Sequence, residues 1–247
     1  MPNVYGVLPV LEALRAGGRR IERLVIAEGA RHERLRDVIE AARQAGIPVR
    51  REPRVALDRL SERANHQGVI AIAAAAKYAE PDRLLSSLSP DTLFILLDGV
   101  EDPHNLGAVV RTAECAGANA IFIPERRAAH LTDVVAKTSA GAIEYVPVAR
   151  VTNLATLIEE LKKKNVWVVG VEASSKMSYE AYDYSGPTAL VFGGEGQGLH
   201  RLVRERCDVL VSIPMRGRIT SLNVSVAVGV VLFEAVRQRR MKSADEV

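Results

Sequence analysis

The sequence has little cysteine, few aromatic residues and no long apolar run. Cys115 and Cys207 are the two cysteines of the 247 residues and form no CxxC pair, so neither a disulfide framework nor a zinc site is expected. No apolar stretch reaches the ~18 residues of a membrane helix. The first residues do not show the basic segment followed by an apolar segment that is typical of a secretory signal peptide. We therefore expect a cytoplasmic protein with no membrane contact and no metal.

Aromatic residues make up 4% of the chain, which argues against a nucleic-acid surface built from stacking platforms. The net charge of +3 is unevenly spread, because residues 1–77 contain 14 Lys and Arg against 9 Asp and Glu. Two interpretations fit this excess about equally: a surface that binds a polyanion, or ordinary solvated helix faces.

Hydrophobic periodicity predicts two α/β segments joined by a linker. In the first segment, residues 1–76, we expect helices at 5–14, 31–45 and 57–64 and strands at 23–27, 47–49 and 69–75. The stretch 77–91 is rich in serine and proline and indicates a linker. Residues 242–247 are polar and are expected to form a disordered tail.

The second segment, residues 92–241, alternates strands and helices more regularly. Strands are expected at 93–97, 120–123, 166–171, 189–192 and 209–213, and helices at 105–116, 131–139, 153–163, 200–205 and 223–239. Short apolar strands between helices are typical of a parallel sheet covered on both faces. Ligands of such sheets collect beyond the carboxyl ends of the strands, so the loops after the strands are the place to look for a site.

The first of these loops belongs to the block LDGVEDPHNLGAVVRTAECAGA at 97–118. Asn105 suits a helix N-cap, because its side-chain oxygen can accept a backbone N–H. Arg111 follows among apolar neighbours and needs a partner there. At about 100° per residue, Arg111 does not share a helix face with Asn105.

The second loop, VFGGEGQGL at 191–199, has four glycines in six residues. Glycine permits a close approach between backbone and ligand, but neither a GK[ST] phosphate loop nor GxGxxG spacing is present. The carboxylate of Glu195 would repel a phosphate and suits a cationic group or a hydroxyl. The alternative is an ordinary tight turn.

The third loop precedes a long apolar helix in the block IPMRGRITSLNVSVAVGVVLFE at 213–234. Ser221 and Asn223 lie at the start of that helix, where they either cap it or contact a ligand. A mostly buried helix behind three polar loops is typical of the floor of a site.

Together the three blocks resemble the SpoU/TrmH family of RNA ribose methyltransferases within the SPOUT superfamily. The motifs YGVLPVLEAL at 5–14 and HQGVIA at 66–71 are similar to the N-terminal extension of its RlmB branch, which methylates a guanosine in 23S ribosomal RNA. The resemblance implies an RNA-binding N-terminal domain of the L30e/L7Ae type and a C-terminal α/β domain with a trefoil knot.

The resemblance also implies S-adenosylmethionine (AdoMet) as methyl donor, methylation of a ribose 2′-hydroxyl, and a homodimer joined near the knot. Two roles are open for Arg111: it removes the hydroxyl proton, or it stays charged and stabilises the developing alkoxide. Matched residue by residue, the cofactor site comprises Gly193, Gly194, Ile213, Met215 and Leu222, and the polar site comprises Asn105, Arg111, Glu195, Ser221 and Asn223.

Two alternatives remain at this point. One is a ribose methyltransferase that acts on tRNA or on another site in ribosomal RNA. The other is an RNA-binding protein that keeps the fold without catalysis. The five matching polar residues favour an enzyme.

Overall fold

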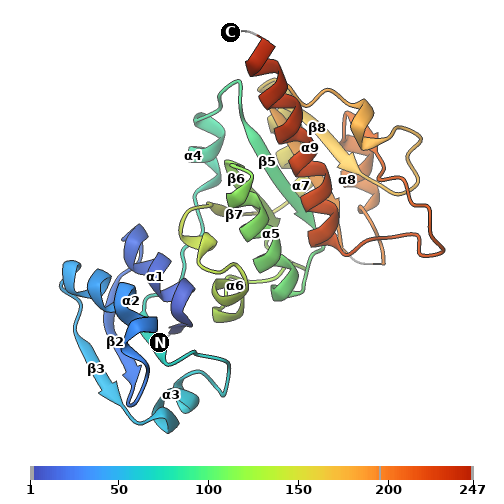
Figure 1. Cartoon of the computed structure of the whole chain (residues 1–247). Coiled ribbons are helices and arrows are strands. Elements are labelled where there is room, and N and C mark those ends of the chain that lie inside the picture. Colours follow the sequence, from blue (N-terminus) through green and yellow to red (C-terminus); the bar gives the residue numbers. More distant parts are fainter. Residues whose placement is uncertain (1–2, 195, 246–247) are drawn as a thin grey trace. The chain divides into compact units, whose positions relative to one another are not determined.

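The computed structural model describes residues 3–194 and 196–245, which form two compact units (Figure 1). The first unit comprises the chain up to Lys77 together with His130–Tyr145. The second comprises Tyr78–Ala129 and the chain from Val146 onward.

The first unit is built on a four-stranded sheet with the order β1-β4-β2-β3. β4 is antiparallel to both β1 and β2, and β3 is parallel to β2. Side chains alternate between the two faces of β2, so Leu24 and Ile26 enter one apolar cluster and Val25 and Ala27 the other. The strands are β1 (Asn3–Tyr5), β2 (Ile21–Ala27), β3 (Val49–Glu52) and β4 (Val69–Ala73). α1 (Val7–Ala16) and α2 (His32–Gln44) pack on the first face, and α3 (Arg54–Leu60) on the second.

The segment His130–Tyr145 belongs to the first unit although the sequence favoured the second. It contains α6 (Asp133–Thr138) and the short helix η1 (Ala142–Glu144). The carboxylate of Glu144 pairs with Arg19 at 2.7 Å, and each of these side chains is only 6% exposed. The hydroxyl of Tyr145 donates to Glu12 at 2.6 Å. These long-range polar contacts have no signature in local periodicity.

The second unit is built on a six-stranded parallel sheet with the order β10-β8-β9-β5-β6-β7. Its strands are β5 (Leu93–Asp98), β6 (Ala120–Pro124), β7 (Val148–Val151), β8 (Trp167–Val171), β9 (Thr188–Gly193) and β10 (Val209–Val211). From β5 the chain continues to one side through β6 and β7, whereas β8 and β10 lie on the other side, beyond β9. The carboxyl ends of β5 and β9 therefore form a topological switch point, where ligands of such sheets bind.

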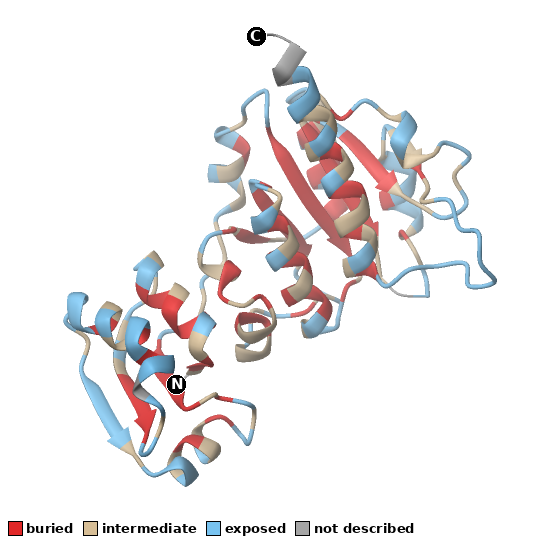
Figure 2. Ribbon diagram, in the orientation of Figure 1, coloured by how far each residue is buried: buried red, intermediate tan, exposed pale blue. Residues whose placement is uncertain are grey.

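Helices cover both faces of this sheet. α4 (Pro81–Ser86), α7 (Leu154–Lys163) and α8 (Arg201–Arg206) supply one apolar cluster. α5 (Pro103–Cys115) and α9 (Val224–Asp245) pack against each other on the opposite face. Figure 2 shows the central strands buried along their length and the two helices exposed along their outer sides.

The structure departs from the predicted elements in several places. β1 and β7 were not predicted, and β3 and α3 begin two to three residues away from their expected starts. α9 continues to Asp245, so the prediction of a disordered tail from residue 242 is wrong as far as the described residues extend. Lys242, which lies in α9, donates a hydrogen bond to the hydroxyl of Ser185. The knot stays a prediction.

Two further observations apply to residues 3–194 and 196–245 alone. None of their helices has the length and hydropathy needed to cross a bilayer. No three of their His, Cys, Asp or Glu side chains gather as metal ligands would.

Candidate functional site

The loops after β5 and β9 are in direct backbone contact at the switch point. The N–H of Gly194 donates to the carbonyl of Asp98 at 2.7 Å. A Cβ on Gly194 would lie 2.1 Å from the carbonyl oxygen of Gly99, and one on Gly193 would lie 2.1 Å from the carbonyl carbon of Gly198. Gly194 is therefore required by packing against the first loop and Gly193 by packing within the second loop, and the alternative of an ordinary turn does not explain these contacts.

A cavity of about 780 Å³, here called the larger cavity, opens beside the glycine loop. Its wall consists mainly of backbone and apolar side chains from the ends of β8 and β9, the third loop and the start of α9. All five residues predicted for the cofactor line it: Gly193, Gly194, Ile213, Met215 and Leu222. Ser221 and Asn223 line it as well, so seven of the ten predicted site residues surround one space.

Asn105 and Asn223 connect the first and third loops. The side-chain amide of Asn223 donates to the Asn105 side-chain oxygen at 2.9 Å, and Asn105 is 9% exposed. The Asn223 oxygen accepts from the backbone N–H of Ser225 at 2.9 Å, so Asn223 also caps α9. Asn223 therefore has the cap role that the sequence left open, and its contact with a ligand stays a prediction.

The expected N-cap role of Asn105 is wrong. The cap of α5 is Asp102, whose carboxylate accepts from the N–H of His104 at 2.8 Å. Pro103 follows at the first helical position, which its fixed φ suits. α5 therefore starts two residues earlier than predicted, which leaves the Asn105 side chain inside the first turn and directed to Asn223.

Within a single chain, Arg111 does not lie beside the other predicted site residues. It lies on the exposed face of α5 and lines neither cavity described here. The next residue, Thr112, faces α9 and lies 3.8 Å from the Cβ position of Gly229. Within residues 3–194 and 196–245, the Arg111 guanidinium has no hydrogen-bond or ion-pair partner. Glu195, its predicted neighbour, lies outside the described residues.

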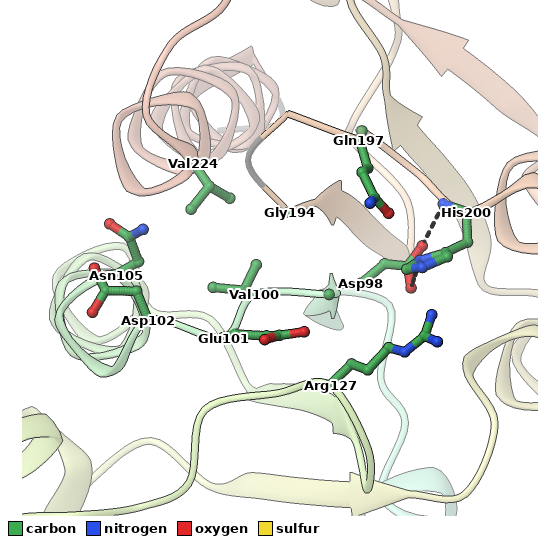
Figure 3. Close-up of a pocket in the computed structure, with 12 residues that line it drawn as sticks. Asp98, Val100, Glu101, Asp102, Asn105, Arg127, Gly194, Gln197, His200 and Val224 are labelled. Atoms are coloured by element: carbon green, nitrogen blue, oxygen red, sulfur yellow. Dashed lines mark hydrogen bonds and ion pairs between the residues drawn. The ribbon is translucent and has the colours of Figure 1, made fainter.

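A second space of about 490 Å³, the smaller cavity, is also lined by Gly194 (Figure 3). The buried carboxylate of Asp98 accepts from the backbone N–H of His200 at 2.7 Å and bonds its Nδ1 at 2.9 Å. These bonds fix the ring and tie the first loop to the second. Glu101, Gln197 and Arg127 also line this cavity.

Sequence reasoning missed these five residues. Asp98 directly after a buried strand was a usable signal, because a carboxylate at that edge of a parallel sheet meets the loops of its neighbours. Arg127 gave no signal, since it lies in a loop outside the three blocks.

Comparison with known proteins identifies the family. Residues 92–233 match the model of the SpoU rRNA Methylase family, and residues 3–79 match the RNA 2′-O ribose methyltransferase substrate-binding domain. The chain belongs to the SpoU rRNA methylase family. The 23S rRNA (guanosine-2′-O-)-methyltransferase RlmB of Xanthomonas campestris is 45% identical over 239 residues, which cover 96% of each chain.

Solved structures of SpoU methylases share the architecture. The SpoU methyltransferase AviRb from Streptomyces viridochromogenes, solved with AdoMet, has a TM-score of 0.81 and 25% identity and covers 97% of this chain and 90% of its own. A TrmH/SpoU tRNA modifying enzyme from A. aeolicus has a TM-score of 0.57 and 32% identity, and covers 66% of this chain and 83% of its own. The match to AviRb therefore extends over both units, and the match to the tRNA enzyme over about two thirds of the chain.

Proposed function

We propose that this SpoU methylase transfers a methyl group from AdoMet to the ribose 2′-hydroxyl of a guanosine in 23S ribosomal RNA in the cytoplasm. The observation that carries the proposal is the larger cavity, around which two separate loops supply all five residues expected to bind the cofactor. The RNA and the nucleotide are those named for the RlmB relatives, which match this chain over nearly its whole length.

The larger cavity fits AdoMet in size and in chemistry. Its volume of about 780 Å³ lies within the roughly 300–1,000 Å³ of typical ligand pockets. Because Gly193 and Gly194 carry no Cβ, backbone groups of the loop can contact a ligand directly. Ile213, Met215 and Leu222 offer apolar surface for an adenine ring and a methionine chain. AdoMet bound there supplies a methyl group that a sulfonium already activates, so the reaction needs no metal.

The chain's own residues have to position the ribose 2′-hydroxyl and stabilise the negative charge that develops on its oxygen. Asn105 and Asn223 hold the two loops at the edge of the cavity, and rigid positioning of the reacting atoms contributes strongly to the rate. We assign Arg111 the charged role: its solvent-exposed guanidinium binds an RNA phosphate and stabilises the developing alkoxide. Ser221 and Glu195 complete the proposed polar site.

We further propose that the enzyme is a homodimer. α9 exposes Val226 (50%) and Phe233 (47%), which lie seven residues apart and therefore on the same helical face. α5, which packs beside α9, exposes Arg111. A second copy that covers these helices would bury the apolar side chains of α9 and would bring Arg111 next to the surface of the partner subunit. Arg111 would then act in a site that is completed only when the second subunit is present.

Residues 1–76, which make up most of the first unit, are proposed to bind the RNA. Arg50, Arg51, Arg54 and Arg59 are exposed on β3 and α3, and none of them forms an ion pair within residues 3–194 and 196–245. Guanidinium groups that are not neutralised by carboxylates are available to RNA phosphates. This interpretation of the basic excess agrees with the substrate-binding domain that matches residues 3–79.

Transfer of tritium from labelled AdoMet tests the function. Transcripts of 23S rRNA and of tRNA are offered separately, and the product is digested to nucleosides. We expect label in 2′-O-methylguanosine from 23S rRNA alone. Label in tRNA would favour the tRNA alternative, and binding of 23S rRNA without transfer would favour a non-catalytic protein.

A further inference from the structure

The smaller cavity adjoins the larger one, and four residues form part of the wall of both. Gly194, Gln197, Gly198 and Val224 line both spaces. If the larger cavity holds the methyl donor, as proposed above, an acceptor ribose at the wall has its base within reach of the smaller cavity. Proteins that recognise RNA by sequence commonly bind bases that are unstacked and splayed out.

The carboxylates around the smaller cavity differ in how many of their oxygens already accept a hydrogen bond. Asp98 is engaged by His200 through both of its oxygens, and Asp102 caps α5. Glu101 is exposed and forms no hydrogen bond or ion pair within the described ranges 3–194 and 196–245. Asp102 uses one oxygen for its cap, so Glu101 is the carboxylate of this cavity that presents two unpaired oxygens to a ligand.

Arg127 is the matching donor. Its guanidinium has no hydrogen bond or ion pair within those same two ranges, and it extends into the cavity from the loop after β6 (Figure 3). Arg127 has a φ of +56°, a left-handed conformation that is unusual for a residue with a side chain. Glu101 and Arg127 carry opposite charges in one cavity without pairing. A ligand with donors on one edge and acceptors on another can bridge them.

Guanine has this pattern. Its N1–H and N2–H₂ groups are adjacent donors that match the two oxygens of a carboxylate, while O6 and N7 are acceptors that match a guanidinium. Adenine offers a single exocyclic donor beside the N1 lone pair, which a carboxylate repels. The pyrimidines lack the O6 and N7 pair.

We propose that the smaller cavity binds the guanine base of the target nucleotide, with Glu101 accepting from N1–H and N2–H₂ and Arg127 donating to O6 and N7. Asp98 and His200 act as positioning residues, because their bonds hold the first and second loops on either side of the base. This inference rests on the proposed function and adds a reason for guanosine specificity that lies within the methylase unit.

The test uses the full-length protein and a 23S rRNA fragment in which the methylated guanosine, once mapped, is replaced by inosine or by 7-deazaguanosine. Inosine lacks the N2 amino group, and 7-deazaguanosine lacks the N7 acceptor. For the wild-type protein, we expect kcat/KM to fall about tenfold with each analogue, as for the loss of one hydrogen bond to a charged group.

Two variants assign the contacts. Glu101→Gln should remove the preference for guanosine over inosine but keep the sensitivity to 7-deazaguanosine, and Arg127→Ala should do the reverse. AdoMet binding should be unchanged in both. The matched controls are Glu125→Gln and Arg126→Ala, whose exposed side chains lie in the same loop as Arg127 but do not line the cavity; they should keep both ratios.

Several results would overturn the inference. Equal kcat/KM for guanosine and inosine in the wild-type protein contradicts it, as does a Glu101→Gln protein that still prefers guanosine tenfold. In both cases methyl transfer itself persists, so the proposed function survives. If the wild-type protein methylates no RNA at all, the proposed function fails first and the inference fails with it.

Discussion

The two cavities of the methylase unit are built in different ways. The larger cavity is lined mainly by glycine backbone and apolar side chains, with Ser221 and Asn223 among its polar residues, and two of its glycines are fixed by contacts in which no Cβ fits. The smaller cavity is lined by charged and polar side chains that reach in from several loops. Backbone walls suit a ligand that never changes, such as a cofactor. Side-chain walls can be altered one residue at a time, which suits recognition of a particular nucleotide.

The largest effect is expected from a residue that lines neither cavity. Arg111→Ala should reduce methyl transfer at least ~1,000-fold, because it removes a charge that stabilises the transition state. AdoMet affinity should stay within about twofold, since the larger cavity is untouched. Transfer kinetics and calorimetry check the two halves of this prediction. A variant that keeps near-normal turnover would rule out the assignment of Arg111.

The next largest effect should come from the wall that the cavities share. Gly194→Ala forces a Cβ to within 2.1 Å of the Gly99 carbonyl oxygen, so the first and second loops have to separate. We expect AdoMet affinity to fall ~30-fold or more, as for overpacking in a tight core. The control is Gly217→Ala, because the nearest atom to its Cβ position is the N–H nitrogen of Ile219 at 4.0 Å. Equal affinities for the two variants would contradict the packing argument.

A double variant in the first unit should leave both cavities intact and still weaken the enzyme. Arg50→Glu with Arg51→Glu reverses two exposed charges on β3. RNA affinity should fall about tenfold or more at low salt, with a shallower dependence on salt, because phosphate contacts release fewer counterions. Filter binding at several salt concentrations measures this. Charge variants are preferable to deleting residues 1–76, since that deletion would leave Glu144 without its buried partner Arg19.

The smallest effect concerns the thiol of Cys207, which should react only slowly with alkylating reagents in the folded protein. Cys207 lies near Leu199 at the end of the second loop, because both side chains come within 3.0 Å of the Cβ position of Gly170, and burial raises the pKa of the Cys207 thiol to about 12. Near pH 8 the thiol therefore stays protonated, and the folded protein should alkylate there at least ~100-fold more slowly than the denatured chain. Gly194→Ala should raise this rate if the loop moves. Mass spectrometry of the modified peptide checks both expectations, and rapid labelling of Cys207 in the native wild-type protein would contradict them.

The sequence predicted most of the methylase unit because its signals are local. Apolar strands between amphipathic helices indicated the parallel sheet, which the structure confirms. The glycine block and the start of the last helix indicated a shared site, and their residues do surround one cavity. β7 was missed because Val148–Val151 is short and contains an arginine.

The remainder depends on contacts between residues far apart in the chain. Asn105 was taken for a cap because its local pattern fits one, whereas Asp102 and Pro103 make the actual start of α5. Glu101 and Arg127 line the same cavity because β5 and β6, which precede their loops, are neighbours in the sheet. The exposed position of Arg111 depends on how α5 packs against α9, and periodicity in one helix does not determine the packing of two.

The most direct measurement is a map of ribose methylation in 23S rRNA from a strain that lacks this gene. We expect one 2′-O-methylguanosine to disappear, to return with the wild-type gene, and to stay absent with the Arg111→Ala variant. An unchanged methylation map, or restoration by that variant, would contradict the account.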